Sequence, residues 1–252
     1  RQAMLAGQAM DSCHECRDQE THGKVSGRQR QLLKAGIREI AWAKTLHSSP
    51  MYDDFAYSQD HQGVTQRSVS DWQIDLGNYC NSACVFCRPE SSSRLAVEFR
   101  RIGLISQLPR ANWCEDPVLL DRFVQHLVSS PKLRYMHFIG GETLITPGFA
   151  RILRALIDAG VAARVTMGFT TNLTVWDQDI VDLLTRFQQV NLGVSVETLT
   201  PVNDYVRWPI KWEKFHTNLD RYRAMNLHDL NLWTTVNTLN INNFLEIQKF
   251  VQ

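Results

Sequence analysis

Residues 72–90 read WQIDLGNYCNSACVFCRPE, and this stretch decides the fold. A short β-prone run over residues 72–76 leads directly into a loop that carries Cys80, Cys84 and Cys87. With three and then two residues between them, the thiols can converge on one point. Parallel α/β proteins carry their sites at the carboxyl ends of strands, so the stretch predicts a metal site at the end of the first strand of such a sheet.

The chain downstream repeats the same arrangement. From residue 71 short β-rich runs alternate with longer helical patterns, which predicts βα units and a parallel sheet. Strands are expected at residues 72–76, 133–139, 164–170, 190–196 and 230–236. Helices are expected at residues 117–128, 147–159 and 177–187, with another starting near Asn243. Five such units are visible between residues 71 and 252.

Three domains are expected along the chain. Residues 1–27 form a short metal-binding segment, residues 28–70 a helix (28–46) and a polar linker or surface loop (47–63), and residues 71–252 the βα units. The chain opens on Arg1 and ends at Gln252 inside a helical pattern, so we expect both natural termini to be missing.

Composition limits the function classes. With 252 residues and 44% hydrophobic residues, the chain can bury one sizeable core. Lys plus Arg number 27 against 26 for Asp plus Glu, which gives no footprint for nucleic acid or a membrane surface. No membrane span or signal peptide is visible, so a cytoplasmic location is expected. Five of the six cysteines lie in two close groups, which favours metal binding over disulfides.

The donor count separates the metals that the cysteine loop could hold. A structural zinc site needs four ligands, whereas an iron–sulfur cube with one open iron needs three. Zinc with Cys114 or His137 as a distant fourth ligand stays an alternative, and a disulfide is weaker because three thiols cannot pair off. If neither residue is a ligand, Cys114 is most simply a small buried hydrophobe near a helix start. His137 is then most simply a core histidine whose hydrogen bonds are satisfied within the protein.

The spacing Cys-x-x-x-Cys-x-aromatic-Cys, with Phe86 before the last cysteine, resembles the defining motif of the radical S-adenosylmethionine (SAM) superfamily. The resemblance implies that Cys80, Cys84 and Cys87 bind three irons of a [4Fe-4S] cluster. It also implies that SAM chelates the fourth iron and that Phe86 contacts the adenine.

The end of the second expected strand extends the resemblance. The segment FIGGETL, residues 138–144, is similar to the GGE motif of the family, which implies that Gly140, Gly141 and Glu142 bind the SAM amino group. Thr143 stands where relatives often carry proline. A plain strand-to-helix turn is the alternative, since glycine pairs are common there.

The third and fourth expected strands end in further polar residues. Asn172 resembles the asparagine of a Thr-Asn-Gly signature, with Leu173 in place of the glycine, and is expected to line the pocket. By resemblance Ser195 and Glu197 bind ribose hydroxyls, although Ser195 alone could simply cap the strand end. Arg207 resembles an arginine near the SAM carboxylate, with a surface salt bridge as the alternative.

A second cysteine pair lies near the start of the chain. Cys13 and Cys16 begin the run C-x-x-C-x-x-Q-E-x-x-G-x-x-S-x-R, which looks like the end of a twitch domain, a reduced relative of the SPASM auxiliary-cluster domain. The order matches the family named for an N-terminal twitch domain and implies an auxiliary iron–sulfur cluster. A zinc knuckle completed by upstream residues and a redox C-x-x-C are the alternatives.

The resemblance as a whole implies a radical SAM enzyme with a TIM-like partial (βα)6 barrel over residues 71–252, in which five units are visible and the sixth is expected beyond Gln252. It would cleave SAM reductively to a 5'-deoxyadenosyl radical that abstracts hydrogen from an unidentified substrate, with peptides among the classes used by twitch and SPASM relatives. The electron would come from a small donor protein of flavodoxin or ferredoxin type. No catalytic residue is assigned beyond the cluster ligands. The alternative is a non-catalytic zinc or iron–sulfur module that docks a partner, which the GGE segment and the Ser195 and Glu197 pair argue against.

Overall fold

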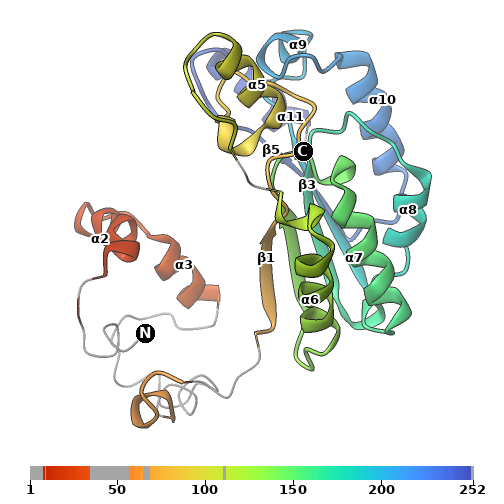
Figure 1. The fold of residues 1–252 in the computed structure, drawn as a ribbon. Coiled ribbons are helices and arrows are strands. Elements are labelled where there is room, and N and C mark those ends of the chain that lie inside the picture. Colours follow the sequence, from red (N-terminus) through yellow and green to blue (C-terminus); the bar gives the residue numbers. More distant parts are fainter. Residues whose placement is uncertain (1–7, 9, 35–56, 65–68, 110–111, 251–252) are drawn as a thin grey trace. The chain divides into compact units, whose positions relative to one another are not determined.

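The chain divides into two units, Arg1–Arg67 and Ser68–Gln252 (Figure 1). The structure is a computed structural model and describes residues 8, 10–34, 57–64, 69–109 and 112–250.

The first unit is a small helical hairpin. A 3-10 turn, η1 (Asp11–Cys13), runs into α2 (His14–Thr21), and α3 (Gly27–Lys34) follows after a turn at Gly23, which has a φ of 70°. The helix expected over residues 28–46 coincides with α3 at its start, and its remainder lies outside the described residues. Within the expected linker, residues 57–60 form a helical turn, while residues 47–56 also lie outside the described part.

The second unit is built on a parallel sheet of five strands in the order β1-β2-β3-β4-β5. The strands are β1 (Asp71–Asp75), β2 (Tyr135–Ile139), β3 (Thr166–Thr171), β4 (Gln189–Ser195) and β5 (Asp229–Trp233). All five predicted strands are confirmed, with bounds that shift by up to three residues. The third begins later than expected because residues 162–164 form a 3-10 turn, η6 (Ala162–Arg164). The described sheet is open, as a partial barrel requires, and does not close on itself.

Four of the described helices cover the outer face of the sheet: α6 (Pro117–Val128), α7 (Pro147–Asp158), α8 (Gln178–Leu184) and α10 (Trp212–Arg223). Figure 1 shows α6, α7 and α8 side by side on this face. Local chemistry sets their ends. Asp116 caps α6 by accepting from two backbone N–H groups, and α7 stops before Gly160, which has a φ of 68°. The helix expected over residues 177–187 is shorter, because Asp177 is its N-cap and the chain turns after Leu184.

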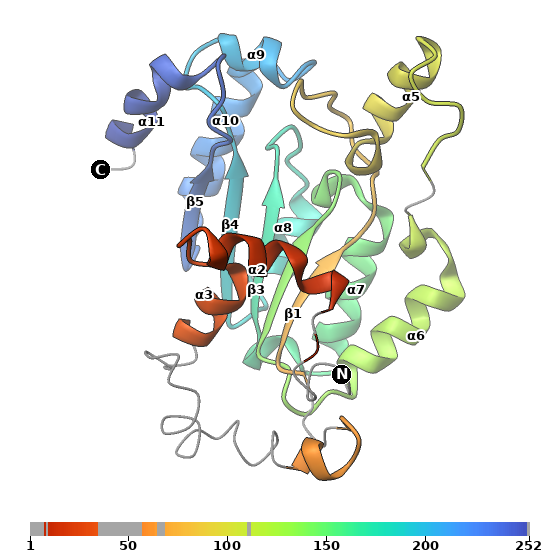
Figure 2. The same cartoon turned by 90° about the vertical axis from the view of Figure 1, so that its left-hand side faces the viewer.

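Other helices surround the carboxyl end of the sheet. They are α5 (Ser93–Arg101), α9 (Val202–Val206) and α11 (Phe244–Phe250), with short 3-10 turns η3 (Pro89–Ser91), η4 (Trp113–Glu115), η5 (Thr143–Ile145) and η7 (Ile241–Asn243). In Figure 2 α5 and α9 lie beyond the arrowheads of the strands. Helix α11 confirms the helix expected near Asn243. None of the described helices is long and apolar enough to cross a membrane.

Strand alternation separates two faces of the sheet. Met136, Phe138, Met167 and Phe169 are fully buried on the outer face, where the ring of Phe149 from α7 packs against Phe138 at a centroid distance of 5.2 Å. The inner face carries mostly polar and small residues. The core therefore lies between the sheet and helices α6, α7, α8 and α10, and the inner face and the carboxyl rim are available for a site.

Candidate active site

A cavity of about 390 Å³ opens at the carboxyl ends of the strands. Most of the predicted site residues of the second unit line it: Cys80, Cys84, Phe86, Cys87, Gly140, Gly141, Asn172, Ser195, Glu197 and Arg207. Glu142 does not line the cavity, and Cys13 and Cys16 belong to the first unit. Residues at or just after the carboxyl ends of β1, β2, β3 and β4 thus line one cavity.

The cysteine loop is held from two sides. Ala83 N donates to Trp208 O over 2.7 Å, and Val85 N donates to Val206 O over 3.0 Å, which attaches the loop to the segment around α9. At its start, Cys80 N donates to the Ser93 hydroxyl at the beginning of α5 over 3.1 Å. The loop is therefore fixed by partners more than a hundred residues away as well as by its neighbours.

The three thiols lie within one cavity wall. Burial raises the pKa of Cys80 to about 11 and also raises the pKa values of Cys84 and Cys87, while the Arg207 guanidinium opposes the shift at the last two. Thiols in such a setting lose their protons on metal binding, since the metal charge replaces the proton. The donor set therefore suits a thiolate-bound metal group.

Single-ion zinc coordination does not match the arrangement. Among the described residues, no three His, Cys, Asp or Glu side chains converge closely enough to hold one metal ion, so the thiols line the cavity without meeting at a point. The proposed fourth ligands are occupied elsewhere: Cys114 Sγ donates to Leu76 O over 3.1 Å, and both ring nitrogens of His137 have hydroxyl partners.

The glycine pair brings two loops together. A Cβ on Gly140, which has a φ of 136°, would lie 2.6 Å from Gly77 O, and a Cβ on Gly141 would overlap Tyr79 O. Gly141 N instead donates to Gly77 O over 2.7 Å. The pair lines the cavity, as expected, and it also lets the backbone that leads into the cysteine loop pass directly against the end of β2.

Glu142 lies elsewhere than predicted. Its carboxylate is buried and accepts from Asn172 N at 2.6 Å, the Thr171 hydroxyl at 2.7 Å and Leu144 N at 3.1 Å. Burial raises the pKa of Glu142, and these three donors oppose the rise. The side chain joins the loop after β2 to the end of β3, and its carboxylate points into the protein.

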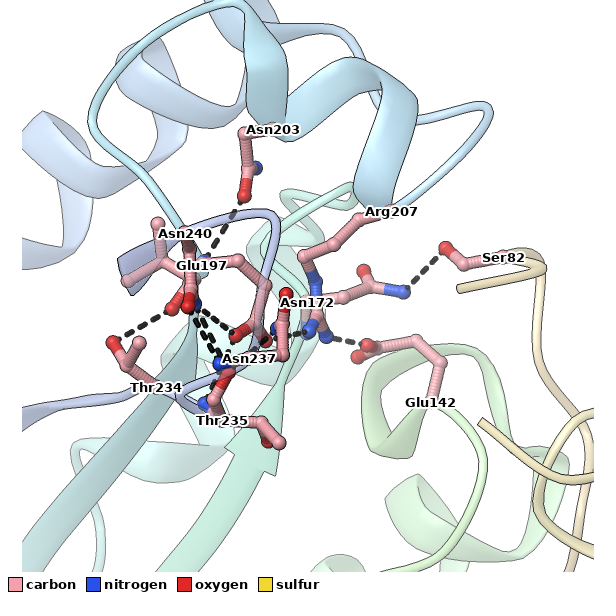
Figure 3. A network of polar contacts seen from close by, with 11 residues as sticks. Ser82, Glu142, Asn172, Glu197, Asn203, Arg207, Thr234, Thr235, Asn237 and Asn240 are labelled. Atoms are coloured by element: carbon pink, nitrogen blue, oxygen red, sulfur yellow. Dashed lines mark hydrogen bonds and ion pairs between the residues drawn. The ribbon is translucent and has the colours of Figure 1, made fainter. Parts of the chain in front are cut away.

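Asn172 connects β3 to the cysteine loop. Figure 3 shows its amide directed at Ser82, and Nδ2 donates to Ser82 Oγ and to Asn81 Oδ1, each over 3.0 Å. The side chain also lines the cavity, as predicted. The next residue, Leu173, has a φ of 56°, a left-handed conformation that explains why glycine suits this position in the related signature.

A buried ion pair forms another part of the wall (Figure 3). Glu197 Oε1 and Arg207 Nη1 are 2.9 Å apart, and their side chains are 1% and 9% exposed. The surface salt bridge considered for Arg207 is therefore wrong. Thr235 N and Asn240 Nδ2 donate to the other carboxylate oxygen, at 2.9 and 3.3 Å. Burial raises the pKa of Glu197, and Arg207 opposes the rise.

Arg207 retains binding capacity toward the cavity. Its Nε is buried without a hydrogen-bond partner in the described part of the chain, and its guanidinium lies 5.8 Å from the ring centroid of Phe86. A buried donor without a partner is costly, so a ligand acceptor would be favoured there. Ser195, the last residue of β4, also faces the cavity.

Several cavity residues were not anticipated from the sequence. Thr170, Trp233, Thr234 and Thr235 lie at the ends of β3 and β5. The expected strand over residues 230–236 ran through the last three, whereas β5 ends at Trp233. The other site residues were located as polar side chains at the ends of expected strands. The same rule would have found Thr234 and Thr235 if the strand had been expected to end at Trp233.

The parallel sheet, the thiol-bearing loop after its first strand and the cavity at its carboxyl rim define a partial-barrel α/β protein with three thiols in one cavity. A family model described as "Radical SAM superfamily" matches residues 74–251, and the chain belongs to this superfamily. Its members are enzymes that use a [4Fe-4S] cluster and SAM.

Solved structures share the fold at low identity. AnSMEcpe with bound AdoMet has a TM-score of 0.50 and 14% identity over 72% of this chain and 50% of its own. Streptococcus suis SuiB bound to S-adenosylmethionine has a TM-score of 0.49 and 15% identity over 97% of this chain and 50% of its own. SuiB bound to precursor peptide SuiA has a TM-score of 0.47 and 14% identity over 86% of this chain and 48% of its own. The chain spans about half the length of these proteins. No curated protein sequence matches it.

Proposed function

We propose that the protein cleaves SAM reductively and uses the resulting radical to abstract hydrogen from a substrate. The observation that carries the proposal is that Cys80, Cys84 and Cys87 line one cavity together with a glycine pair and a buried Arg–Glu pair. The three cysteines would hold the [4Fe-4S] cluster. When bound, the reduced cluster supplies the electron that splits SAM into methionine and a 5'-deoxyadenosyl radical.

The other cavity residues would bind and orient SAM. Arg207, with its unpaired Nε, supplies positive charge and a donor for the SAM carboxylate, and Glu197 fixes its guanidinium. Ser195 offers a hydroxyl for the ribose, and Phe86 offers a ring for the adenine. The backbone of Gly140 and Gly141 is left to meet the amino group, because the Glu142 carboxylate is engaged elsewhere.

The finer assignments concern substrate and electron donor. The resemblance of the first unit to a twitch domain makes peptides the first substrate class to test. A flavodoxin- or ferredoxin-type protein is the proposed source of electrons. Thr170, Thr234 and Thr235 give the cavity hydroxyl groups beyond those assigned to SAM, and these suit a substrate with hydrogen-bonding groups.

The first unit would carry an auxiliary cluster at Cys13 and Cys16. The two cysteines lie one helical turn apart at the start of α2. The other residues of the motif hold the hairpin: the Glu20 carboxylate accepts from Ser26 Oγ at 2.5 Å and from the Arg28 guanidinium. The sequence motif thus serves one local structure that presents the two thiols, which supports a metal site completed by further ligands.

Anaerobic reconstitution of the full chain tests the main proposal. Iron and sulfide content, the EPR spectrum of the reduced protein and 5'-deoxyadenosine from SAM and dithionite are measured together. Single alanine variants of Cys80, Cys84 and Cys87 should lose the SAM-dependent EPR change and 5'-deoxyadenosine. Cys114→Ala is the matched control and should keep both. One equivalent of zinc without SAM cleavage would instead establish a structural metal module.

A double variant tests the auxiliary site separately. Cys13→Ala/Cys16→Ala should lower the iron content while 5'-deoxyadenosine formation persists without substrate. Unchanged iron content would remove the two cysteines from the ligand set. Zinc retained in the wild-type protein and lost in the double variant would favour the zinc knuckle.

A further inference from the structure

Two short segments form the wall of the cavity beside the thiols. The cysteine loop runs alongside the segment that ends α9, because Ala83 N donates to Trp208 O over 2.7 Å and Val85 N donates to Val206 O over 3.0 Å. These segments supply four of the residues that line the cavity: Cys84, Phe86, Cys87 and Arg207. Backbone hydrogen bonds therefore hold the cavity side and the outer side of this wall in a fixed relation.

The outer side of the wall carries exposed apolar side chains. Val85 lies between two residues that line the cavity, and Trp208 follows a third, yet neither of them lines it. Val85 is 51% exposed, Trp208 is 46% exposed, and Tyr205 at the end of α9 is 67% exposed. Large apolar side chains that gather on one surface mark sites of protein association, and Trp and Tyr are enriched in such interfaces. The wall therefore has a cavity on one side and a candidate docking surface on the other.

Arginines adjoin these apolar side chains. The guanidinium carbon of Arg94 lies 4.3 Å from the ring centroid of Trp208, and Arg88 is exposed next to Cys87. Among the described residues, neither arginine forms an ion pair with a carboxylate. From residue 88 to residue 101 the chain carries four arginines against two glutamates, so the net charge of this stretch is positive.

These features together define one surface. We call it the outer wall surface, and it consists of Val85, Arg88, Arg94, Tyr205 and Trp208.

The outer wall surface lies close to the thiols without opening onto them. Val85 is bonded to Cys84 and Arg88 to Cys87, and consecutive Cα atoms are about 3.8 Å apart. A protein seated on this surface would therefore lie one residue away from two of the proposed cluster ligands while staying outside the cavity. A substrate must enter the cavity to react, whereas an electron can cross the wall. The position therefore suits an electron donor better than a substrate.

We propose that the outer wall surface docks a small acidic electron-donor protein, with Tyr205 and Trp208 as its apolar centre and Arg88 and Arg94 as its positive rim. The inference rests on the proposed function and adds the place where the donor binds. An acidic donor complements the unpaired arginines, and aromatic residues with arginine carry most of the binding energy in many interfaces. In this contact the reduced cofactor of the donor passes one electron through the wall to the thiol-bound cluster, and no bond forms between the two proteins.

Two reductants test the docking surface without knowledge of the substrate. Dithionite is a small ion that needs no docking surface, whereas photochemically reduced flavodoxin is an acidic protein that does. The rate of 5'-deoxyadenosine formation by the reconstituted protein is measured with each, and the ratio of the flavodoxin-driven rate to the dithionite-driven rate is the readout. Trp208→Ala and Arg88→Glu should lower this ratio about tenfold, which corresponds to about 1.4 kcal/mol of lost binding energy. Added salt should lower the ratio in the wild-type protein and less so in Arg88→Glu.

Matched controls lie on α6, away from the cysteine loop. Val118 and Arg122 are exposed there, so Val118→Ser and Arg122→Glu should keep the wild-type ratio, whereas Val85→Ser and Arg88→Glu should lower it. A wild-type ratio in Trp208→Ala and Arg88→Glu would overturn the docking surface. A wild-type protein that accepts electrons from dithionite but not from flavodoxin would overturn it as well. Absence of 5'-deoxyadenosine from every protein with both reductants would instead overturn the proposed function.

A second measurement does not depend on activity. Backbone hydrogen exchange of the reconstituted protein is followed by mass spectrometry with and without an excess of oxidised flavodoxin. Exchange should slow in residues 83–88 and 202–208 and stay unchanged in α6. An unchanged exchange rate in both of these segments would refute the proposal, even where a substitution has lowered both reduction rates equally.

A second copy of this chain is the other occupant that the experiments separate. Sedimentation of the wild-type protein and of Trp208→Ala measures self-association. A dimer that is lost in Trp208→Ala, together with an unchanged ratio of the two reduction rates, would assign the surface to self-association and overturn the donor assignment.

Discussion

Glu197 and Arg207 are ten residues apart in sequence and form a buried ion pair, with 2.9 Å between Oε1 and Nη1, that fixes the cavity wall. Glu197 follows β4, and Arg207 follows α9. The neighbours of Arg207 receive the backbone N–H groups of Ala83 and Val85 from the cysteine loop. One charged contact therefore links the end of the sheet, α9 and the proposed ligand loop.

Replacement of one partner should be costly. In Arg207→Met the Glu197 carboxylate stays buried without its countercharge, which costs about 3–5 kcal/mol of unfolding free energy. Urea denaturation of the metal-free protein measures the change. The double variant Glu197→Leu/Arg207→Met should recover much of the loss, because no unpaired charge remains. A single-variant loss below about 1 kcal/mol, the value typical of surface pairs, would contradict the buried pair.

Glu142→Gln distinguishes a structural carboxylate from a SAM ligand. The amide NH₂ would face one of the three donors that the carboxylate now accepts, so unfolding free energy should fall by about 1–3 kcal/mol. Glu98→Gln on exposed α5 is the control and should change stability little. Loss of SAM affinity, measured by equilibrium dialysis, without loss of stability would favour the original ligand assignment.

Asn172→Ala should release the cysteine loop from β3. Two hydrogen bonds to Asn81 and Ser82 disappear, and buried acceptors are left unpaired, so we expect a loss of about 1–3 kcal/mol and a lower iron content after reconstitution. Asn231→Ala, on the exposed strand β5, is the same substitution without these partners. Equal thermal shifts for the two variants would count against the cross-link.

Gly141→Ala should be more damaging than an ordinary glycine substitution. The added methyl group overlaps Tyr79 O, so the cysteine loop must move away from β2, at a cost of about 1–3 kcal/mol or more. Gly27→Ala meets no neighbouring atom within 4 Å and serves as the control. Circular-dichroism melting and iron content report the two effects. A Gly141→Ala protein with wild-type values would mean that the loop is not packed against the glycine.

The lowered pKa of His137 predicts a pH dependence of stability. Burial holds the pKa of His137 in the folded protein below the ordinary histidine value of 6.5, so between the two values the unfolded chain binds more protons. The stability contribution of the uncharged ring is therefore present above pH 6.5 and is lost as pH falls through the folded pKa. Urea titrations of wild type and His137→Phe between about pH 5 and 8 isolate the effect. A stability difference between the two proteins that does not shrink toward pH 5 would contradict the sign.

The sequence by itself determined the features that depend on residues close to one another along the chain. Spacing within eight residues identified Cys80, Cys84 and Cys87. Periodicity with glycine and proline signals located all five strands and helices α6, α7, α8 and α11, but not α5, α9 or α10. The family resemblance, confirmed for residues 74–251, follows from these local patterns. The expected polar residues at strand ends line one cavity because parallel strands bring their carboxyl ends to the same edge.

Only the tertiary structure decided which partner each polar group takes. Asn172 meets Ser82 across 90 residues, Glu142 turns away from the cavity toward β3, and Arg207 is buried with Glu197 instead of lying at the surface. His137 reaches Trp233 only because the sheet curves and two intervening strands carry glycine. Such contacts depend on chain closure over long separations, and residue type and local period do not encode which of several possible donors and acceptors come within 3 Å of each other.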